Sequence, residues 1–316
     1  MHDTLSLLAL VTPVFLLMAA GFGLRKARVL NQHADESLLG VIVKLLVPCL
    51  AWDVIIGNPV FDHPKNLLLP PIFGFLSIAL GLGVCIVGAR LFRLGDKNVC
   101  RTFAHVAGIQ NYGYLALPIC QAVFDRDTVG MLFAFNLGVE IAFWTLGIAT
   151  LTGKTHPQEW LKAINPPIIA IVSALTFNAL GAGHWLPAPL HTAIHMLGVC
   201  AVPLGLTITG AILADYATVS TLTAGWKTIA AANLLRCGLL PLIILGVAYA
   251  LPLDSTLKSI LVLQAAMPAA VFPLVTARLH GGDMPTALGV VVGTCLLGLV
   301  TIPLWLTFGL RWILSQ

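Results

Sequence analysis

Long apolar stretches follow one another along nearly the whole chain, separated only by short polar segments. A helix needs about 20 such residues to cross the hydrocarbon layer of a membrane. Ten stretches approach this length: 5–24, 36–57, 67–92, 102–123, 129–152, 166–183, 190–213, 222–250, 258–279 and 285–312. Only 9% of the residues are charged, where a soluble domain has about 25%. Because the apolar runs are continuous, not alternating, we expect an all-α membrane protein of ten transmembrane helices rather than a β-barrel.

The basic residues of the connecting segments are unevenly distributed. Connections after odd-numbered stretches hold eleven of them: Arg25, Lys26, Arg28, Arg90, Arg93, Lys97, Arg101, Lys154, Lys162, Lys227 and Arg278. Connections after even-numbered stretches, together with the C-terminus, hold four: Lys65, Arg126, Lys258 and Arg311. Because cytoplasmic loops carry the excess of Lys and Arg, we expect the odd-numbered connections in the cytoplasm and both termini outside.

The first apolar stretch differs from a cleavable signal peptide. The chain begins MHDT, without a basic segment, and the stretch runs to Leu24 and ends in RKAR. We therefore expect it to be retained, as the first span of a multi-pass protein of the cell's inner (plasma) membrane.

Cysteine, histidine and charge patterns exclude several kinds of site. The seven cysteines contain no CxxC pair, and the nine histidines contain no HExxH set. His191 and His195 are four residues apart but have no third ligand nearby, so we expect neither a metal nor a cofactor. The net charge of +4 is dispersed without a run of Lys or Arg. Nucleic acid is therefore not an expected partner.

Prolines inside the apolar stretches recur at one interval. Three pairs lie 154 or 155 residues apart: Pro13 and Pro167, Pro48 and Pro203, and Pro118 and Pro273. This spacing indicates that 1–155 and 156–316 are two copies of one five-span unit. Since five is odd, the second copy must enter the membrane inverted with respect to the first. Inverted repeats are typical of secondary transporters, whose substrate site lies at mid-membrane where broken helices meet.

The proline interval aligns GIQNYGYLALPI in the fourth stretch with LVLQAAMPAAVFP in the ninth. Pro118 and Pro273 each lack an N–H group, so each is suited to the first turn of a new half-helix. Both second half-helices then begin near mid-membrane, where their free N–H groups and positive dipole ends could bind an anion. Irregular backbone at this depth is tolerated only inside the protein or along a wet cavity.

Polar side chains accompany both interruptions and are the expected substrate-binding residues. They are Gln110, Asn111, Tyr112, Tyr114 and Pro118 in the first, and Gln264, Pro268 and Pro273 in the second. Asn111 is expected to donate its amide to a substrate oxygen. Tyr112 and Tyr114 could donate hydroxyls, stack on the substrate, or pack against the unwound backbone.

Charges inside the spans are functional candidates, because each is costly when unpaired in the membrane. Glu140 and Arg236 fall near mid-depth of the fifth and eighth stretches. Arg236 could bind a substrate carboxylate or form a buried ion pair with Glu140. If it binds substrate, Glu140 could carry a coupled proton, and His105 could join such a relay. Lys44 can extend to the membrane surface.

The ordered motifs resemble those of the auxin efflux carrier family, which includes the plant PIN-FORMED carriers and many bacterial transporters. The resemblance rests on TPVFLLMAAGFGLRKARVL, VKLLVPCLAWDVI, GIQNYGYLALPI, INPPIIAIVSAL, VPLGLTITGAIL and MPAAVFPLVTARLHGGD followed by TIPLWL. The short connection GKTHPQEWLKA, where plant carriers have a long loop, looks bacterial. The third stretch also lacks the acidic residue of plant carriers.

The resemblance implies two inverted five-helix repeats with crossed broken helices 4 and 9. Helices 1, 2, 6 and 7 would form a scaffold, and helices 3–5 and 8–10 a transport unit that moves by an elevator-type mechanism. Bacterial members are associated with dicarboxylates such as malonate and malate, and plant members with auxin. A homodimer in the lipid bilayer is one candidate assembly.

We therefore expect a secondary transporter for a small organic anion, either a mono- or a dicarboxylate. The alternative is a sodium-coupled organic anion symporter of the bile acid type, although sodium sites need clustered acids and the core has few. An intramembrane enzyme would need a catalytic set such as two aspartates at mid-membrane, GxSG with His, or HExxH, and the chain has none of these. We expect no catalytic residues.

Overall fold

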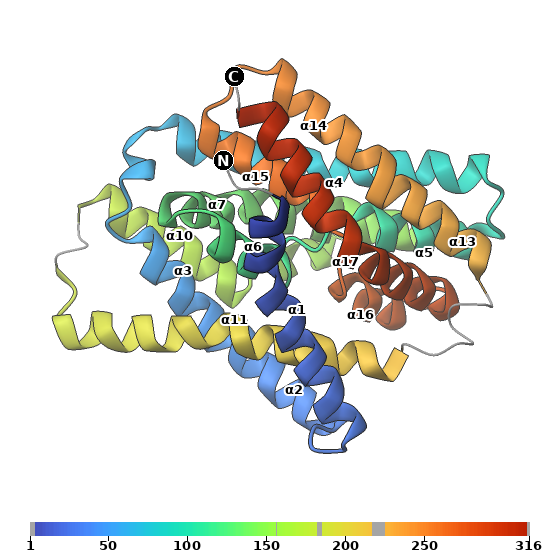
Figure 1. Cartoon of the computed structure of the whole chain (residues 1–316), viewed down its shortest axis with the longest axis horizontal. Helices are drawn as coiled ribbons and strands as arrows, with labels where there is room; N and C mark the ends of the chain where they lie inside the picture. Colours follow the sequence, from blue (N-terminus) through green and yellow to red (C-terminus); the bar gives the residue numbers. More distant parts are fainter. Residues whose placement is uncertain (1–3, 156, 182–184, 217–224, 315–316) are drawn as a thin grey trace.

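The computed structural model describes residues 4–155, 157–181, 185–216 and 225–314. This part of the chain is built from helices, and its single β-bridge joins Gln110 to Ala269. Figure 1 shows the helices stacked around the segments that carry this bridge.

The first half of the chain begins with two long helical spans and a third that follows a short loop. Its helices are α1 (Thr4–Lys26), α2 (Gln32–Val41), η1 (Ile42–Leu46), α3 (Val47–Ile55), η2 (Pro59–Asp62), α4 (Lys65–Leu91), α5 (Lys97–Gly108), α6 (Ala116–Val123), α7 (Arg126–Ala142), η3 (Phe143–Gly147) and α8 (Ile148–Thr152). The second half follows with α9 (Pro157–Trp160), η4 (Leu161–Ala163), α10 (Pro166–Ala179), α11 (Ala188–Tyr216), α13 (Trp226–Ala232), η6 (Asn233–Leu239), α14 (Leu240–Ala250), α15 (Ser255–Ala266), α16 (Phe272–Leu279) and α17 (Met284–Leu314).

Asp and Asn side chains fix where several helices begin. Asp96, Asp125 and Asp254 cap α5, α7 and α15, and Asn31 and Asn165 cap α2 and α10. Each accepts a hydrogen bond from an N–H of the first turn, which would otherwise lack a partner inside the helix. Each of these capping residues therefore marks where a polar connection ends and the next helix begins.

Seven helices of the described chain are long and apolar enough to cross a membrane, which confirms an all-α membrane protein. The bent pair 157–163 and 166–179 would make an eighth. The count falls short of the ten expected stretches for two reasons. α10 has only 14 residues, and the stretches 102–123 and 258–279 are both interrupted.

The two interrupted helices match each other closely. The halves α5 and α15 have 12 residues each, and the halves α6 and α16 have 8 each. Pro118 and Pro273 lie in the first turns of α6 and α16, where the missing N–H of proline costs least.

The interruptions, 109–115 and 267–271, are hydrogen-bonded to each other. The Asn111 N–H donates to Pro268 O at 2.8 Å, and the Ala270 N–H donates to Ile109 O at 3.0 Å. These bonds satisfy backbone groups that no helix can satisfy at the break. Both interrupted segments are therefore held together inside the protein.

Glycines allow two helix pairs to pack closely. A Cβ added to Gly21 of α1 would lie 1.8 Å from Thr207 O of α11, and one added to Gly74 of α4 would lie 2.0 Å from Phe135 O of α7. Small residues at such crossings are common between membrane helices, because backbones can then approach closely. α3 packs on α10 and α11, whereas α17 packs on α13, η6 and α15.

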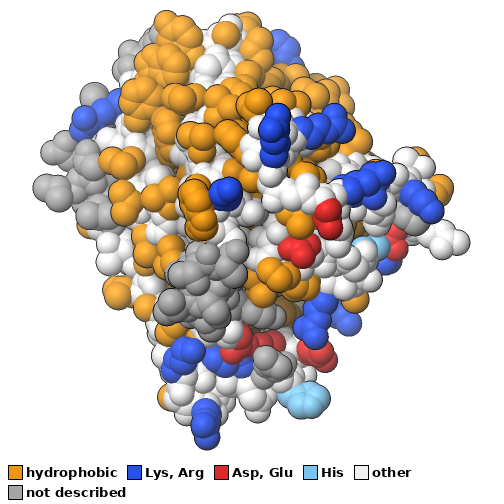
Figure 2. All heavy atoms as spheres, turned by 90° about the vertical axis from the view of Figure 1, so that its right-hand side faces the viewer, with side chains coloured by type: hydrophobic (Ala, Val, Ile, Leu, Met, Phe, Trp, Pro, Cys, Tyr) orange, Lys and Arg blue, Asp and Glu red, His pale blue; other side chains and the backbone are white. Residues whose placement is uncertain are grey.

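Much of the outer surface is apolar. Figure 2 views the right-hand end of Figure 1, where the α4–α5 connection lies; Lys and Arg side chains outnumber Asp and Glu on this end, beside a broad apolar area. The sides of the helices expose large apolar residues, including Leu68, Ile72 and Leu76 of α4. A lipid environment accounts for such exposure, which would be costly in water.

Candidate functional site

A cavity of about 240 Å³ lies beside the meeting point of the two interrupted helices. Its lining comes from both interruptions (109–115 and 267–271), from the cap residue Asn165, and from η1, α3, α6, α7, η3, α10, α11 and α16. The lining residues are Ile42, Val43, Val47, Asn111, Tyr112, Gly113, Tyr114, Leu117, Pro118, Phe133, Asn136, Glu140, Trp144, Asn165, Pro167, Ile168, Ile171, Ala201, Val202, Gly205, Ala270 and Phe272.

Most of the lining is aliphatic or aromatic, as in typical small-molecule sites. The Trp144 and Phe272 rings meet edge to face, with centroids 6.1 Å apart. Two π-helical segments, η1 and η3, contribute to the wall. Such segments are frequent at functional sites, because they redirect side chains out of the regular helical pattern.

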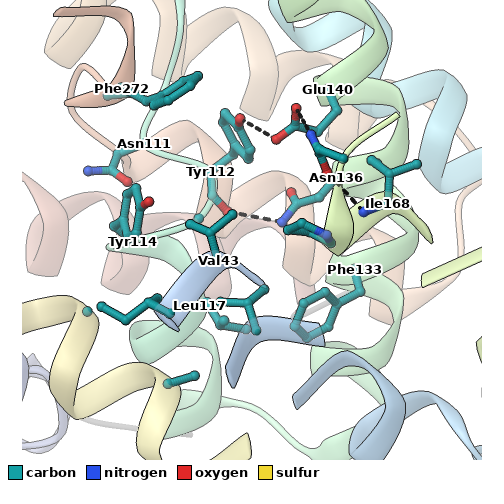
Figure 3. A pocket seen from close by; sticks show the side chains of 18 of the residues that line it. Val43, Asn111, Tyr112, Tyr114, Leu117, Phe133, Asn136, Glu140, Ile168 and Phe272 are labelled. Atoms are coloured by element: carbon teal, nitrogen blue, oxygen red, sulfur yellow. Dashed lines mark hydrogen bonds between the residues drawn. The ribbon is translucent and has the colours of Figure 1, made fainter. Parts of the chain in front are cut away.

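Asn111 is fixed by its own backbone neighbours. Its side-chain Oδ1 accepts the Leu115 N–H at 3.1 Å, and 2% of the residue is exposed. Since Oδ1 must face this donor, the amide Nδ2 is the atom that can donate to a ligand. Figure 3 shows Asn111 and Tyr114 close together on one side of Tyr112.

The expectation of bare N–H groups at the start of α6 needs correction. The N–H groups of Leu115, Ala116 and Leu117 donate to Asn111 Oδ1, Asn111 O and Gly113 O. Within the described chain, the N–H groups of Gly113 and Tyr114 have no such acceptor, and both residues line the cavity. Local turns therefore satisfy the N–H groups at the start of α6. The N–H groups that remain available to a ligand belong to Gly113 and Tyr114, just before α6.

Glu140 lies in the cavity wall with three donors on its carboxylate. Tyr112 Oη donates to Oε1 at 2.7 Å, while Trp144 Nε1 and Asn165 Nδ2 donate to Oε2 at 3.0 and 3.1 Å. One turn earlier on α7, Asn136 Nδ2 donates to Tyr112 O at 3.3 Å. Figure 3 shows Tyr112, Asn136 and Glu140 turned toward one another.

The structure does not pair Glu140 with Arg236. Arg236 is fully buried, and none of its three side-chain nitrogens finds a hydrogen-bond partner in the described chain. It also does not line the cavity. Arg236 lies inside the π-helical segment η6. Its side chain therefore points in a different direction from that of the same residue in a regular α-helix.

Five other predicted residues do not line the cavity: His105, Gln110, Gln264, Pro268 and Pro273. His105 Nδ1 lies 2.9 Å from Gly147 O, and its Nε2 lies 2.8 Å from Thr276 Oγ1. His105 therefore joins α5 to η3 and α16 and does not contact Glu140. Gln110 Nε2 donates to Ser77 Oγ at 2.8 Å, and Gln264 is fully buried.

Sequence reasoning missed the wall that faces the interruptions. Trp144, Asn165 and the aliphatic residues of η1, α10 and α11 were not expected at the site. One signal was available for Trp144, because it lies four residues after Glu140 and so on the same helical face. Asn165 precedes two prolines at the start of α10, a pattern that predicts a helix cap but not a ligand contact.

Arg236→Met tests the placement of this buried arginine. A guanidinium without a protein partner is costly to bury, so an apolar residue of similar length is expected to leave the thermal stability unchanged or to raise it. Carboxylate affinity, measured by titration of the purified protein, should stay within about twofold of the wild type. A large loss of affinity with unchanged stability would instead assign Arg236 to the substrate.

Comparison with known proteins shows that transporters are similar to this chain over most of its length. The chain is 25% identical to an uncharacterised transporter of Methanothermobacter thermautotrophicus, over 93% of this chain and 96% of that relative. It is 22% identical to an uncharacterised transporter of Methanocaldococcus jannaschii, over 92% and 95% of the two chains. It is also 23% identical to auxin efflux carrier component 8 of Arabidopsis thaliana, over 87% and 90%.

The profile of one protein family covers nearly the whole sequence. The family described as membrane transport protein matches residues 6–159 and 152–306. These two segments contain both interrupted helices and every residue of the cavity wall. The chain belongs to this membrane transport protein family, the family of the auxin efflux carriers.

Proposed function

We propose that this protein is a secondary transporter that carries a small organic anion across the membrane by alternating access. The observation that carries the proposal is the position of the cavity, where two interrupted helices meet inside a bundle of spanning helices. Secondary transporters of inverted-repeat architecture bind their substrates at such a point.

The arrangement supports ten membrane passes in two inverted repeats. The seven long helices, α10 and the two interrupted helices together make ten. The first halves of the two interrupted helices have the same length, and so do the second halves. Each first half begins with an aspartate cap, Asp96 or Asp254. With an odd number of passes per repeat, the two copies would cross the membrane in opposite directions. The distribution of basic residues favours termini on the outside, in the inner membrane of the cell.

Helix packing supports a division into two units around the cavity. α11 packs on α1 and α3, and α3 packs on α10; these four helices would form the scaffold. α4 to α8 and α13 to α17 would form the transport unit, which contains both interrupted helices. Residues from both units line the cavity. An elevator-type movement of the transport unit against the scaffold would open the cavity first to one side of the membrane and then to the other.

The donors around the first interruption favour a carboxylate. Asn111 Nδ2 and the N–H groups of Gly113 and Tyr114 lie just before α6, whose N-terminus carries a partial positive charge. The remaining wall is largely apolar, which suits an anion with an apolar body. The name of the Arabidopsis relative, which gives auxin as its cargo, agrees with this class of substrate.

A sodium-coupled symporter is the second candidate. Asn136 Oδ1 is a buried acceptor without a hydrogen-bond donor in the described chain. It lies one turn from the Glu140 carboxylate, and both residues line the cavity. Carbonyl and carboxylate oxygens are the ligands that hard cations prefer, so the experiment includes sodium.

Thermal shift and uptake measurements test the proposal. Purified protein is titrated with phenylacetate, malonate and malate, each with and without sodium, and uptake of the best ligand is then measured in proteoliposomes. We expect at least one carboxylate to raise the melting temperature and to enter the vesicles without sodium. Sodium-dependent uptake would favour the second candidate. Absence of both binding and uptake for all three would contradict an organic anion transporter.

A further inference from the structure

We infer that Glu140 binds a proton when the substrate anion binds, so that the protein carries one anion and one proton together. The inference rests on the proposed function and names its coupling ion. It follows from the charges in the cavity wall, the hydrogen bonds of the carboxylate, and the position of Glu140 between two groups of helices.

Among the described residues that line the cavity, one is acidic and none is basic. Glu140 is the sole carboxylate of this described lining, which contains no Lys, Arg or His. At an effective dielectric constant of about 20, two unit charges about 8 Å apart repel enough to weaken binding about 30-fold. Glu140 and the donors of the first interruption line the same cavity of about 240 Å³. A proton on Glu140 removes the repulsion.

The charged groups around Glu140 leave this negative charge uncompensated. Tyr112 donates to the carboxylate, and Tyr114 lines the same cavity. Lys162 lies with its Nζ 5.8 Å from the Trp144 ring centroid, but it is paired with Glu159 at 2.7 Å. The elements that pack against α7 in the described chain bring no other ionisable side chain into contact with Glu140; they are η2, α3, α4, α6, η3, α10 and α15.

The hydrogen bonds suit both protonation states. Without an anion, three donors satisfy the ionised carboxylate: Tyr112, Trp144 and Asn165. Once protonated, Glu140 needs an acceptor for its O–H. Asn136 Oδ1, a buried acceptor with no donor in the described chain, lies one turn away on α7, within the reach of neighbouring side chains on a helix. The bound anion is a second acceptor.

Glu140 also connects the two units. It lies on α7, whereas Asn165 immediately precedes α10, and their side chains are hydrogen-bonded at 3.1 Å. A hydrogen bond to an ionised carboxylate is about twice as strong as one between neutral groups. Protonation therefore weakens this contact between α7 and α10, so the loaded form is freer to move. The proton enters from one side, stays on one carboxylate oxygen during the movement, and leaves with the anion on the other side.

Phenylacetate and its neutral analogue phenylacetamide test the inference on the intact protein. Affinities are measured from about pH 5.5 to about pH 8, where phenylacetate remains ionised. For the wild type, phenylacetate affinity should fall at least about tenfold as the pH rises, whereas phenylacetamide affinity should stay constant. Glu140→Gln imitates the protonated side chain, so phenylacetate should bind it tightly at every pH. Glu36→Gln, a carboxylate change on the exposed side of α2 and outside the cavity, should keep the wild-type pH dependence.

Transport in proteoliposomes gives an independent readout. A pH gradient should drive accumulation of phenylacetate by the wild type beyond that in protein-free vesicles, into which the undissociated acid diffuses, with a matching extra alkalinisation of the proton-donating side. Glu140→Gln should lose this accumulation and keep exchange of internal for external phenylacetate. Wild-type affinity that does not change with pH, or proton-driven accumulation by Glu140→Gln, would overturn the inference while leaving the anion transporter intact. Absence of binding by phenylacetate, malonate and malate alike at every pH would count against both the inference and the proposed function.

Discussion

Asn111→Ala is expected to weaken carboxylate binding about tenfold to 100-fold while the helices remain folded. The change removes the Nδ2 donor beside the cavity, and a hydrogen bond to a charged group contributes about 1.5–3 kcal/mol. It also removes the acceptor of the Leu115 N–H, a loss of about 1 kcal/mol at a helix start. Isothermal titration with the best ligand measures the first effect, and the melting temperature measures the second.

Two variants separate binding from local folding. Asn111→Asp keeps an acceptor for the Leu115 N–H but removes the amide donor and adds a negative charge, so binding should be lost at least as strongly as in Asn111→Ala. Gln110→Ala changes the neighbouring residue, which bonds Ser77 behind the cavity, so its affinity should stay near the wild type. Recovery of binding in Asn111→Asp would mean that Asn111 acts only through the backbone of α6.

Gly74→Ala is expected to prevent the close packing of α4 on α7 and to destabilise the protein by about 3 kcal/mol. The added Cβ would lie 2.0 Å from Phe135 O, and a backbone atom cannot move aside as a flexible side chain can. Because α7 carries Asn136 and Glu140, a shift of this helix would also deform the cavity. Thermal unfolding in detergent, followed by tryptophan fluorescence, measures the effect.

Gly83→Ala is the matched control on the same helix. A Cβ added at Gly83 meets no atom within 4 Å, and alanine favours a helix over glycine by about 0.5–1 kcal/mol. Its melting temperature should equal or slightly exceed that of the wild type. Equal melting temperatures for Gly74→Ala and Gly83→Ala would show that α4 and α7 do not approach as closely as described.

The interruptions could be predicted because their cause is local. Pro118 and Pro273 mark helix starts because a second helix breaker, Gly113 or Pro268, stands a few residues before each. Single prolines such as Pro13, Pro203 and Pro303 lie inside α1, α11 and α17. The same holds for the caps, since Asp96 and Asp254 act on the residues that follow them. The long apolar helices also follow from local composition.

The walls of the cavity could not be predicted, because they depend on contacts between distant segments. Ile168 of α10 and Ile42 of η1 line the cavity, but in the sequence they resemble any lipid-facing residue. The π-helical segments add a second difficulty. Arg236 lies in the π-helical segment η6, which departs from the regular helical pattern. Its pairing with Glu140, one of the two roles expected for it, was wrong.

The central claim is that a carboxylate binds in the cavity beside the meeting point of the two interrupted helices. Crystals grown with 4-bromophenylacetate test it most directly, because anomalous scattering locates bromine independently of the protein coordinates. We predict one strong bromine peak in the cavity walled by Tyr114, Trp144 and Phe272, with the carboxylate toward Asn111. A bromine peak elsewhere on the protein, with none in this cavity at saturating ligand, would contradict the account.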